Sequence, residues 1–476
     1  MKFTLRNIIE FTTVITIIVL SVAIPSVDPL FSILLIIWTA CMFYSLREIK
    51  KRAMLFAFLV SFFIFLIGRD FVKQFLAYKV ETLPRNSEIH TWISLIISLI
   101  TLVLSFNFFS ERLEDKDTFK KQLTELGSLY KLSVRQNSLI FFYFSYIFAI
   151  ISKVAVIIYV KNSSFTQYYI GYSDYLRNNF ILYIMSKIEI IMPISWAIYL
   201  GTFPKKKEIK FPLFLYVVYL IISLGTGQRS TSMLGLLFLM IYFLFRDREG
   251  EVWITKKMVI IVLLSLPFLA FFISFYEVYR QGFRFTSNNI FEGMLKFFYD
   301  QGVTSTVVKK AYMYRAFIPD QIYTLEFMHT GILPRLFNIP VYHGNNVEHA
   351  LYGGSFTHSL SYTIMINSYL SGRGAGSCYI AELFQDFSYP GIILGNIIYG
   401  YLIYKISDLS EYKYISNGYK LFIIPFILWA PRGSFTNFFS QTLVPSTLIT
   451  FLFIFTLSYA MIYRYIKAKN ISRANF

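Results

Sequence analysis

Residues 91–109 read TWISLIISLITLVLSFNFF, a run of nineteen residues with no charged side chain. An apolar helix of about 20 residues is long enough to cross the hydrocarbon core of a bilayer. Inside lipid, the backbone polar groups of such a segment must be satisfied within the segment itself, which a helix does. This stretch therefore predicts a transmembrane helix, and similar runs recur along the chain.

The composition indicates the same class of protein. Of the 476 residues, 56% are hydrophobic and 15% are charged, whereas a soluble chain carries about 25% charged residues. We predict an all-α, polytopic integral membrane protein with about twelve transmembrane helices, formed by residues 1–476 as one membrane domain. The predicted spans cover residues 8–25, 29–46, 53–69, 91–109, 139–160, 180–200, 211–226, 231–246, 258–276, 389–406, 421–437 and 444–463.

The distribution of Lys and Arg predicts the orientation of these spans. Short loops such as 47–52 and 205–207 are rich in basic residues, and the short loops on the opposite side are poor in them. Short cytoplasmic loops carry the excess of Lys and Arg. We therefore expect both termini in the cytoplasm, with the first span retained as an anchor. This topology accounts for the net charge of +18, so no nucleic-acid partner is needed to explain it.

Several classes of chemistry are excluded by missing motifs. Cys41 and Cys378 fall in a predicted span and a predicted outer loop, so a disulfide framework is not expected. No CxxC or His/Cys spacing indicates a metal, and no GxxxxGK[ST] motif indicates ATP binding. We expect no cofactor, and the energy for any reaction must come from the substrate or from an ion gradient.

The long segment 277–388 is predicted to be a large, partly helical extracytoplasmic loop that carries the functional site. Asn289 and Glu292 have the spacing of a capping box, and Gly302 follows as a C-cap. A second helix is expected from Thr304 to about Ala316. These signals predict that the loop folds onto the outer face of the membrane.

A glycine-rich turn lies near the end of this loop. Residues 371–377 read SGRGAGS and run into a predicted helix that carries Glu382 and Asp386 on one face. Backbone N–H groups at such a turn favour an anion, and Arg373 adds a charge with bidentate geometry. The alternative is a flexible turn before a helix.

Further arginines are predicted on the outer side. Arg229 stands in a short turn between two spans, and Arg432 repeats this situation in WAPRGS at 429–434. Snorkelling to the lipid headgroups is the alternative to binding a lipid-linked anion. Snorkelling also explains Lys153 and Lys187, which lie inside spans. Arg280, Arg284 and Arg315 lie in the large loop.

Four of the five histidines fall in the large loop, and His358 lies in the sequence GGSFTHS at 353–359. A histidine is the side chain best suited to proton transfer at neutral pH. The usual alternative for a loop histidine is polar surface. Arginine pairs with phosphate and aromatic rings stack on sugars, so this side of the protein suits diphosphates and glycans.

The chain resembles the Wzy-type polymerases of lipid-linked oligosaccharide repeat units, which build O-antigens and capsular polysaccharides. The similar stretches are GQRS at 227–230, FFYDQGV at 297–303, GSFTH at 354–358, and GRGAGS at 372–377 continuing to YPG at 389–391. The resemblance covers nearly the whole length. It implies a metal-independent glycosyltransferase on the outer face of a bacterial plasma or inner membrane.

The resemblance also implies roles for individual residues. The substrates would be undecaprenyl-diphosphate-linked glycans, and a chain-length regulator and a flippase would be partners besides membrane lipid. The diphosphate would be bound by arginines, namely Arg229, Arg280, Arg284, Arg315, Arg373 and Arg432. His358 is the first choice for the general base, with Asp300 and Glu382 behind it.

Three alternatives remain at this point. An O-antigen ligase would share the arginines and the histidine. A transporter or flippase for a lipid-linked sugar would more often show paired broken helices in matching halves and lack a large outer loop. A structural membrane protein without activity is the third alternative.

Overall fold

The computed structural model describes residues 5–78, 83–113, 125–163, 165–227, 229–248, 252–280, 289–409 and 413–474. Every element within these ranges is a helix. The first half holds α1 (Leu5–Ala23), α2 (Pro29–Arg47), α3 (Ala53–Phe62), the π-helical turn η1 (Phe63–Ile67), α4 (Gly68–Leu76), α5 (Arg85–Leu113), α6 (Glu125–Asn162), α7 (Phe165–Asn178), α8 (Phe180–Glu189), α9 (Ile191–Gly201) and α10 (Lys206–Gly225).

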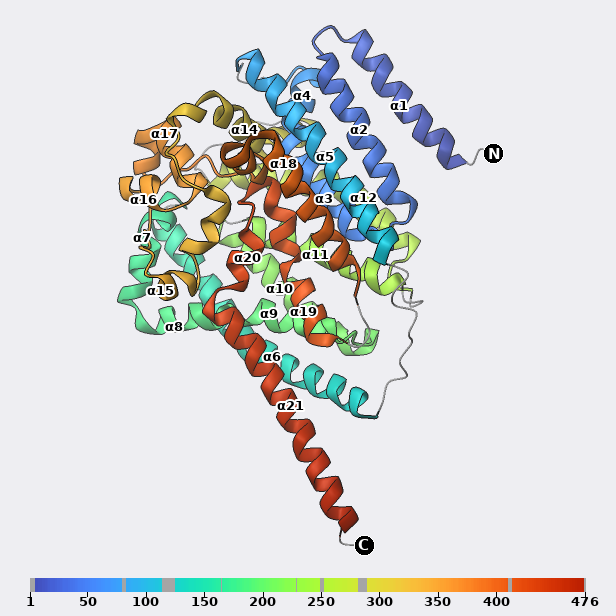
Figure 1. The fold of residues 1–476 in the computed structure, drawn as a ribbon, viewed down its shortest axis with the longest axis vertical. Coiled ribbons are helices and arrows are strands. Elements are labelled where there is room, and N and C mark those ends of the chain that lie inside the picture. The colour runs from blue at the N-terminus through green and yellow to red at the C-terminus, as the bar shows by residue number, and fades with distance from the viewer. Residues whose placement is uncertain are drawn as a thin grey trace.

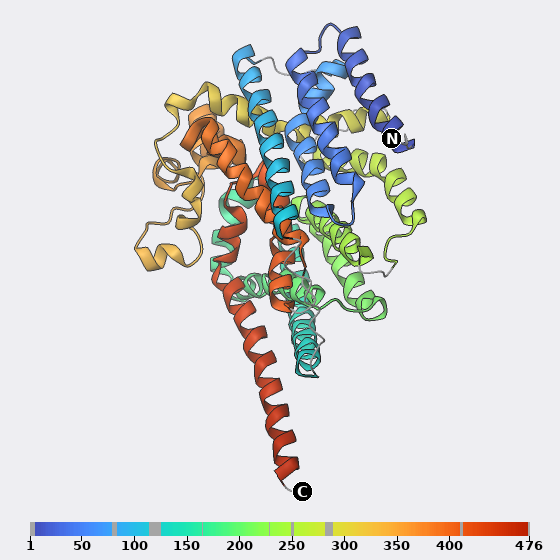
Figure 2. The same ribbon diagram turned by 45° about the vertical axis from the view of Figure 1, so that its right-hand side comes forward.

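The second half begins with the long helices α11 (Arg229–Arg248) and α12 (Lys256–Arg280), followed by shorter helices of the large loop. These are α13 (Ile290–Gln301), α14 (Val303–Met313), η3 (Arg315–Phe317), η4 (Tyr323–His329), α15 (Leu333–Phe337), α16 (Val347–Tyr352) and α17 (Phe356–Leu370). The chain ends with α18 (Tyr379–Ser407), α19 (Tyr414–Trp429), η5 (Ala430–Arg432), α20 (Asn437–Thr442) and α21 (Pro445–Ala474). In both ribbon views α21 projects from the other helices toward the C-terminus (Figures 1 and 2).

Each of the twelve predicted spans coincides with a helix or a run of helices. Eight spans in the described part of the chain are long and apolar enough to cross a membrane; they lie in α2, α3–α4, α5, α6, α8–α9, α10, α11 and α21. The remaining predicted spans correspond to α1, α12, α18 and α19, so the count of twelve stays a prediction. The span predicted at 421–437 lies too far along the chain, because α19 begins at Tyr414 and ends at Trp429, and Pro431 follows in η5.

Polar groups join the long helices to one another, as is common between helices in a membrane. The Ser105 hydroxyl of α5 donates to the carbonyl of Ile397 in α18 at 2.8 Å. The Asn417 amide of α19 donates to the carbonyl of Gly201 at the end of α9 at 3.3 Å. These bonds fix pairs of helices that are far apart in the sequence.

The large loop lies against the end of the bundle where α4 ends and α5 begins, which we call the loop end. Lys309 of α14 forms an ion pair with Asp70 of α4 at 2.6 Å. The indole N–H of Trp92 donates to the other Asp70 oxygen at 3.1 Å. Both charged side chains are almost fully buried, at 3% and 1% exposure. This buried pair joins the loop helices to the membrane helices.

Most local signals of the loop are confirmed. The side chain of Asn289 accepts from the N–H of Glu292 at 2.8 Å, which caps α13, and Gly302 follows the helix as its C-cap. The second helix is α14, which begins at Val303 and ends at Met313, three residues earlier than predicted. The glycine-rich turn runs into α18 as expected.

Candidate functional site

Two histidine rings stack on each other in the large loop. The rings of His358 in α17 and His349 in α16 have centroids 3.6 Å apart. Nδ1 of His358 lies 2.9 Å from the hydroxyl of Tyr369, and that hydroxyl donates to the carbonyl of Asn346 at 3.0 Å. The only proton of the tyrosine hydroxyl is therefore used. His358 must carry its proton on Nδ1, which leaves the lone pair on Nε2.

The surroundings of His358 keep this ring neutral. Burial, followed by the neighbouring His349, lowers the pKa of His358 to about 3. Burial raises the pKa of Tyr369 to about 12, so its hydroxyl stays protonated. At neutral pH His358 is therefore a hydrogen-bond acceptor at Nε2, in a fixed orientation.

Glu382 is a buried carboxyl group that joins two loops. It lies in the first turn of α18 and is 1% exposed. Its Oε1 lies 2.5 Å from the hydroxyl of Ser377, and its Oε2 accepts from the N–H of Phe435 at 2.7 Å. Burial, followed by Glu326, raises the pKa of Glu382 well above its usual range. Glu382 therefore holds its proton more tightly than an ordinary carboxyl group, and it ties the glycine-rich turn to the segment after η5.

Glu326, in η4, is the second acid of this cluster, and no sequence motif marks it. Burial raises its pKa, and the hydroxyls of Ser434 and Ser355 and the neighbouring His329 partly offset that effect. Nδ1 of His329 is buried with no partner among the described residues. The ring lies so close to Gly354 that a Cβ there would meet Cδ2 of His329 at 2.6 Å, and Gly354 has a φ of +68°. The glycine of GSFTH is thus required by its backbone and by this histidine.

The glycine-rich turn has a fixed conformation. The Asn345 amide donates to the carbonyl of Arg373 at 3.0 Å. The N–H of Arg373 donates to the Ser368 carbonyl, and that of Ala375 to the Ser361 hydroxyl, both at 2.9 Å. These two N–H groups are consequently not offered to an anion, contrary to the simplest expectation for this turn. The guanidinium of Arg373 is exposed and has no partner within the described part of the chain.

Arg315 lies beside a kink in α18. Its guanidinium donates to the Ser388 hydroxyl at 2.9 Å and stacks over the ring of Phe384 at 4.6 Å. Ser388 has φ 57° and ψ −149°, a strained conformation for a residue with a side chain. Pro390 follows two residues later and lacks the N–H that would bond to a carbonyl on the other side of the kink. The kink therefore places a hydroxyl where Arg315 can bind it.

Arg432 and Arg69 meet the C-terminal end of α13. Arg432 donates to the carbonyl of Gln301 at 3.1 Å. Arg69 donates to the carbonyl of Tyr299 at 3.4 Å and stacks on its ring at 4.0 Å. Cations are favoured at this end of a helix dipole. Gly302 permits the contact, because a Cβ there would lie 2.6 Å from the backbone nitrogen of Arg69.

The remaining predicted site residues lie elsewhere. Asp300 pairs with Lys296 on the same helix at 2.8 Å. Arg229 is the first residue of α11 and Arg280 is the last of α12, and their side chains are outside the described part of the structure. Arg284 lies outside the described residues altogether.

The family follows from a match over nearly the whole chain. Residues 6–464 match the family model described as O-antigen polysaccharide polymerase Wzy. The chain belongs to the Wzy family. Comparison with curated proteins and with solved structures found no match. This Wzy protein is thus a multi-pass membrane protein that polymerises O-antigen repeat units and acts on lipid-linked glycans.

The donor set of the Wzy chain is poor in metal ligands. Within the described ranges, no three His, Cys, Asp or Glu side chains gather to hold a metal ion. The titratable side chains described above instead form two pairs, His349 with His358 and Glu326 with Glu382. No sequence motif surrounds Glu326, and only the folded loop brings it close to Ser434, Ser355 and His329.

Proposed function

We propose that the Wzy reaction takes place on the loop end, and that it is a displacement of diphosphate by a sugar hydroxyl. The donor is a glycan on undecaprenyl diphosphate, and the acceptor is a repeat unit on the same carrier. The acceptor oxygen bonds to the anomeric carbon of the donor while the bond from that carbon to the diphosphate oxygen breaks. The electron pair leaves with undecaprenyl diphosphate, and the acceptor proton passes to a base.

One observation supports this location above the others. Glu326 lies against the hydroxyls of Ser434 and Ser355. Ser434 follows Arg432 by two residues, and Ser355 precedes His358 by three. A single acid thereby connects the segment that carries a predicted diphosphate ligand with the segment that carries the predicted base.

His358 is the base we assign. Its Nε2 carries the lone pair, and Tyr369 and His349 fix the orientation of the ring. Its pKa of about 3 makes it a weak base in the absence of substrate. An anion close to an imidazole favours the protonated form, so a bound diphosphate strengthens this base when the substrate is present.

The arginines stabilise the negative charge that develops on the leaving diphosphate. Arg315 and Arg432 are ordered by hydrogen bonds, and Arg373 is exposed in a fixed turn. Arg229 completes the set that binds the leaving diphosphate, and Arg280 and Arg284 hold the diphosphate of the second substrate. Guanidinium groups bind phosphate oxygens in pairs, so the proposed mechanism needs no metal ion.

Asp300 and Glu382 are second choices for the base. Asp300 forms an ion pair with Lys296 on the same helix. Glu382 holds a proton through its raised pKa and would have to lose it before it could act.

We place the reaction on the outer face of a bacterial plasma or inner membrane, with both termini in the cytoplasm and with a flippase and a chain-length regulator as partners.

The test uses a deletion strain complemented with His358→Asn. Asparagine keeps a donor near the position of Nδ1 for Tyr369 but removes the lone pair of Nε2. We expect single repeat units on the surface glycan and an accumulation of lipid-linked repeat units. The matched control is His343→Asn, an exposed histidine of the same loop, which should restore full-length glycan.

Two results would contradict the proposal. Full-length glycan from His358→Asn at a normal protein level would remove this residue as the base. Unchanged chain length in the deletion strain, with loss of attachment to lipid A, would favour the ligase over the polymerase.

A further inference from the structure

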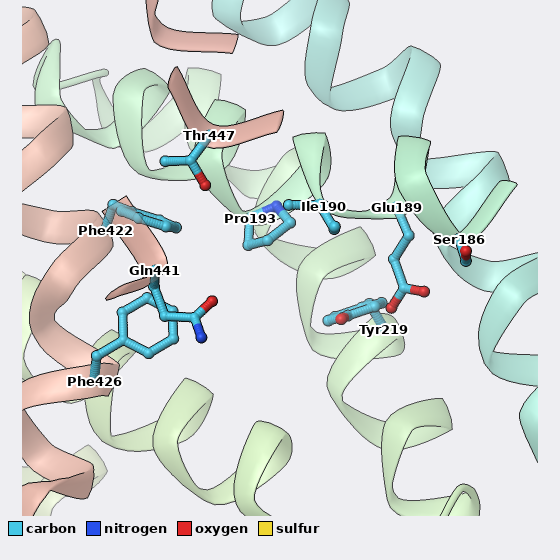
Figure 3. A pocket seen from close by; sticks show the side chains of 9 residues that line it. All are labelled: Ser186, Glu189, Ile190, Pro193, Tyr219, Phe422, Phe426, Gln441 and Thr447. Atoms are coloured by element: carbon cyan, nitrogen blue, oxygen red, sulfur yellow. The ribbon is translucent and has the colours of Figure 1, made fainter. Parts of the chain in front are cut away.

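A cavity lies within the helix bundle, outside the residues assigned above. Its volume is ≈ 290 Å³, and it is formed by α8, α9, α10, α19, α20 and α21. Figure 3 shows Glu189 and Tyr219 on one side of it and Phe422, Phe426 and Gln441 on the other. Small-molecule sites have volumes of about 300–1,000 Å³; this cavity lies just below that range and has room for no more than a single small ring.

A charged pair borders the cavity. The carboxylate of Glu189 lies 2.6 Å from Nζ of Lys153 in α6 and accepts from the Ser152 hydroxyl at 2.5 Å. The snorkelling predicted for Lys153 is therefore wrong, because its charge is neutralised inside the bundle. Charged residues within membrane spans are costly, and they commonly mark functional sites.

Pro193 explains why the carboxylate lies at this position. The helical span 180–201 is divided at Ile190 into α8 and α9. A proline lacks the N–H that would bond to the carbonyl four residues earlier, which here belongs to Glu189. Glu189 is thus the last residue of α8, and both it and Pro193 line the cavity.

The lining indicates the chemistry of a ligand. Glu189 and Lys153 cancel in charge, so the cavity does not select an anion. Hydrogen-bonding groups are available from Glu189, Tyr219 and Gln441, and the Gln441 amide has no hydrogen bond to any residue that the structure describes. Phe422 and Phe426 add aromatic rings, whose negative faces attract the polarised C–H groups of a sugar.

We propose that this cavity binds one sugar ring of the lipid-linked glycan. This inference rests on the proposed function, since it names a subsite for the same substrate. A sugar ring is neutral, carries several hydroxyl groups and has one apolar face. Its hydroxyls match the Gln441 amide and the neutralised Glu189 carboxylate, and its apolar face matches Phe422 and Phe426. A diphosphate does not match, because none of the residues that line the cavity is positively charged.

The cavity is joined to the proposed reaction site through α20. Gln441 lies on this helix, nine residues after Arg432. The ring of Phe439, also in α20, packs edge-on against Phe327 of η4 with centroids 5.0 Å apart. The N–H of Ile332 also donates to the carbonyl of Leu443 at 3.2 Å. A sugar in the cavity would therefore lie next to α20, and α20 packs against η4, the helix that contains Glu326.

The first test replaces Phe426 with the photoreactive residue p-benzoylphenylalanine in the full-length protein. The host is a strain that makes the natural lipid-linked repeat unit. Irradiation should give an adduct whose mass shift falls to that of one or a few sugar residues on treatment that cleaves the glycan. The control places the same residue at Phe455, which is 46% exposed on α21 and should yield phospholipid adducts. Phospholipid adducts alone at Phe426 would overturn the proposal.

The second test measures polymerisation with purified lipid-linked repeat unit and Gln441→Leu. Loss of one hydrogen bond to a neutral group should raise KM by about 3–10-fold with kcat unchanged. Gln136→Leu, at an exposed position of α6, should leave both constants unchanged. An unchanged KM for Gln441→Leu would refute the subsite. If the wild-type protein makes no polymer from this substrate, the proposed function fails instead, so the two failures are distinguishable.

Discussion

Replacing Glu382 with glutamine and with alanine separates a protonated carboxyl from an ionised one. A protonated glutamate donates through one oxygen and accepts through the other, and a glutamine side chain does the same. In Glu382→Gln the amide oxygen can accept from the N–H of Phe435, and the amide nitrogen can donate to the Ser377 hydroxyl. We therefore expect this variant to fold and to polymerise glycan like the wild type.

The alanine variant should be severely destabilised. It removes the partner of the Phe435 N–H at 2.7 Å and of the Ser377 hydroxyl at 2.5 Å. A buried polar group left without a partner costs about 1–3 kcal/mol. With two such groups, the free energy of unfolding of Glu382→Ala should fall by about 2–6 kcal/mol.

The pH dependence of the stability gives a second test of whether Glu382 is protonated. Burial raises the pKa of Glu382 in the folded protein above the ordinary value of 4.5. The folded protein then binds this proton more tightly than the unfolded chain, so wild-type stability falls as pH rises from 4.5 toward the raised value. Glutamine has no proton to lose. The free energy of unfolding of Glu382→Gln, relative to that of the wild type, should therefore increase as pH increases.

The measurement is the midpoint of thermal unfolding of purified protein in detergent at pH 5 and pH 8, followed by tryptophan fluorescence. Glycan length in a complemented deletion strain gives the activity. Glu348→Gln, at an exposed position of α16, is the control for loss of an acidic group. Equal destabilisation by Gln and Ala at both pH values would show that the carboxylate is ionised and would refute this reasoning.

Three further results are expected. Arg373→Ala should lower the polymerisation rate by about 10²–10³-fold. Arg373→Lys should lower it by less, because lysine keeps the charge but not the planar fork. Full-length glycan from Arg373→Ala at normal expression would contradict this. Lys309→Met should cost about 3–5 kcal/mol of stability by leaving Asp70 unpaired, and Asp70→Asn combined with Lys309→Met should recover most of the unfolding midpoint. In a cysteine-free background on spheroplasts, an impermeant maleimide should label Glu348→Cys and leave Lys207→Cys unlabelled; the reverse labelling would invert the orientation.

Features encoded by neighbouring residues could be predicted from the sequence. Apolar runs located the helices, because the bilayer requires about 20 consecutive apolar residues. The cap at Asn289 and the end of α13 at Gly302 depend on residues three or four positions apart, and both are confirmed. The glycines of GSFTH and DQG were recognised as motifs, but their contacts with His329 and Arg69 were not predicted.

Contacts between distant segments could not be predicted, since no local pattern reports them. Lys309 and Asp70 are 239 positions apart, and each alone is an ordinary charged residue. Lys153 was expected to snorkel, and only the packing of α8 against α6 reveals its pairing with Glu189. Glu326 has no motif of its own; its raised pKa arises from burial in the folded loop. The helices could therefore be predicted from the sequence, whereas the partners of the buried charged residues are evident only from the tertiary structure.

The described contacts of the His358 ring are consistent with the order of events that we propose. A guanidinium beside His358 would keep its imidazole neutral even with substrate present, because like charges oppose protonation. The described neighbours of His358 are instead His349 and Tyr369, which are uncharged at neutral pH. The negative charge of a bound diphosphate is then the strongest local influence on the pKa of His358. Base strength rises only after the donor is bound, so the acceptor hydroxyl is activated when it has an anomeric carbon to attack.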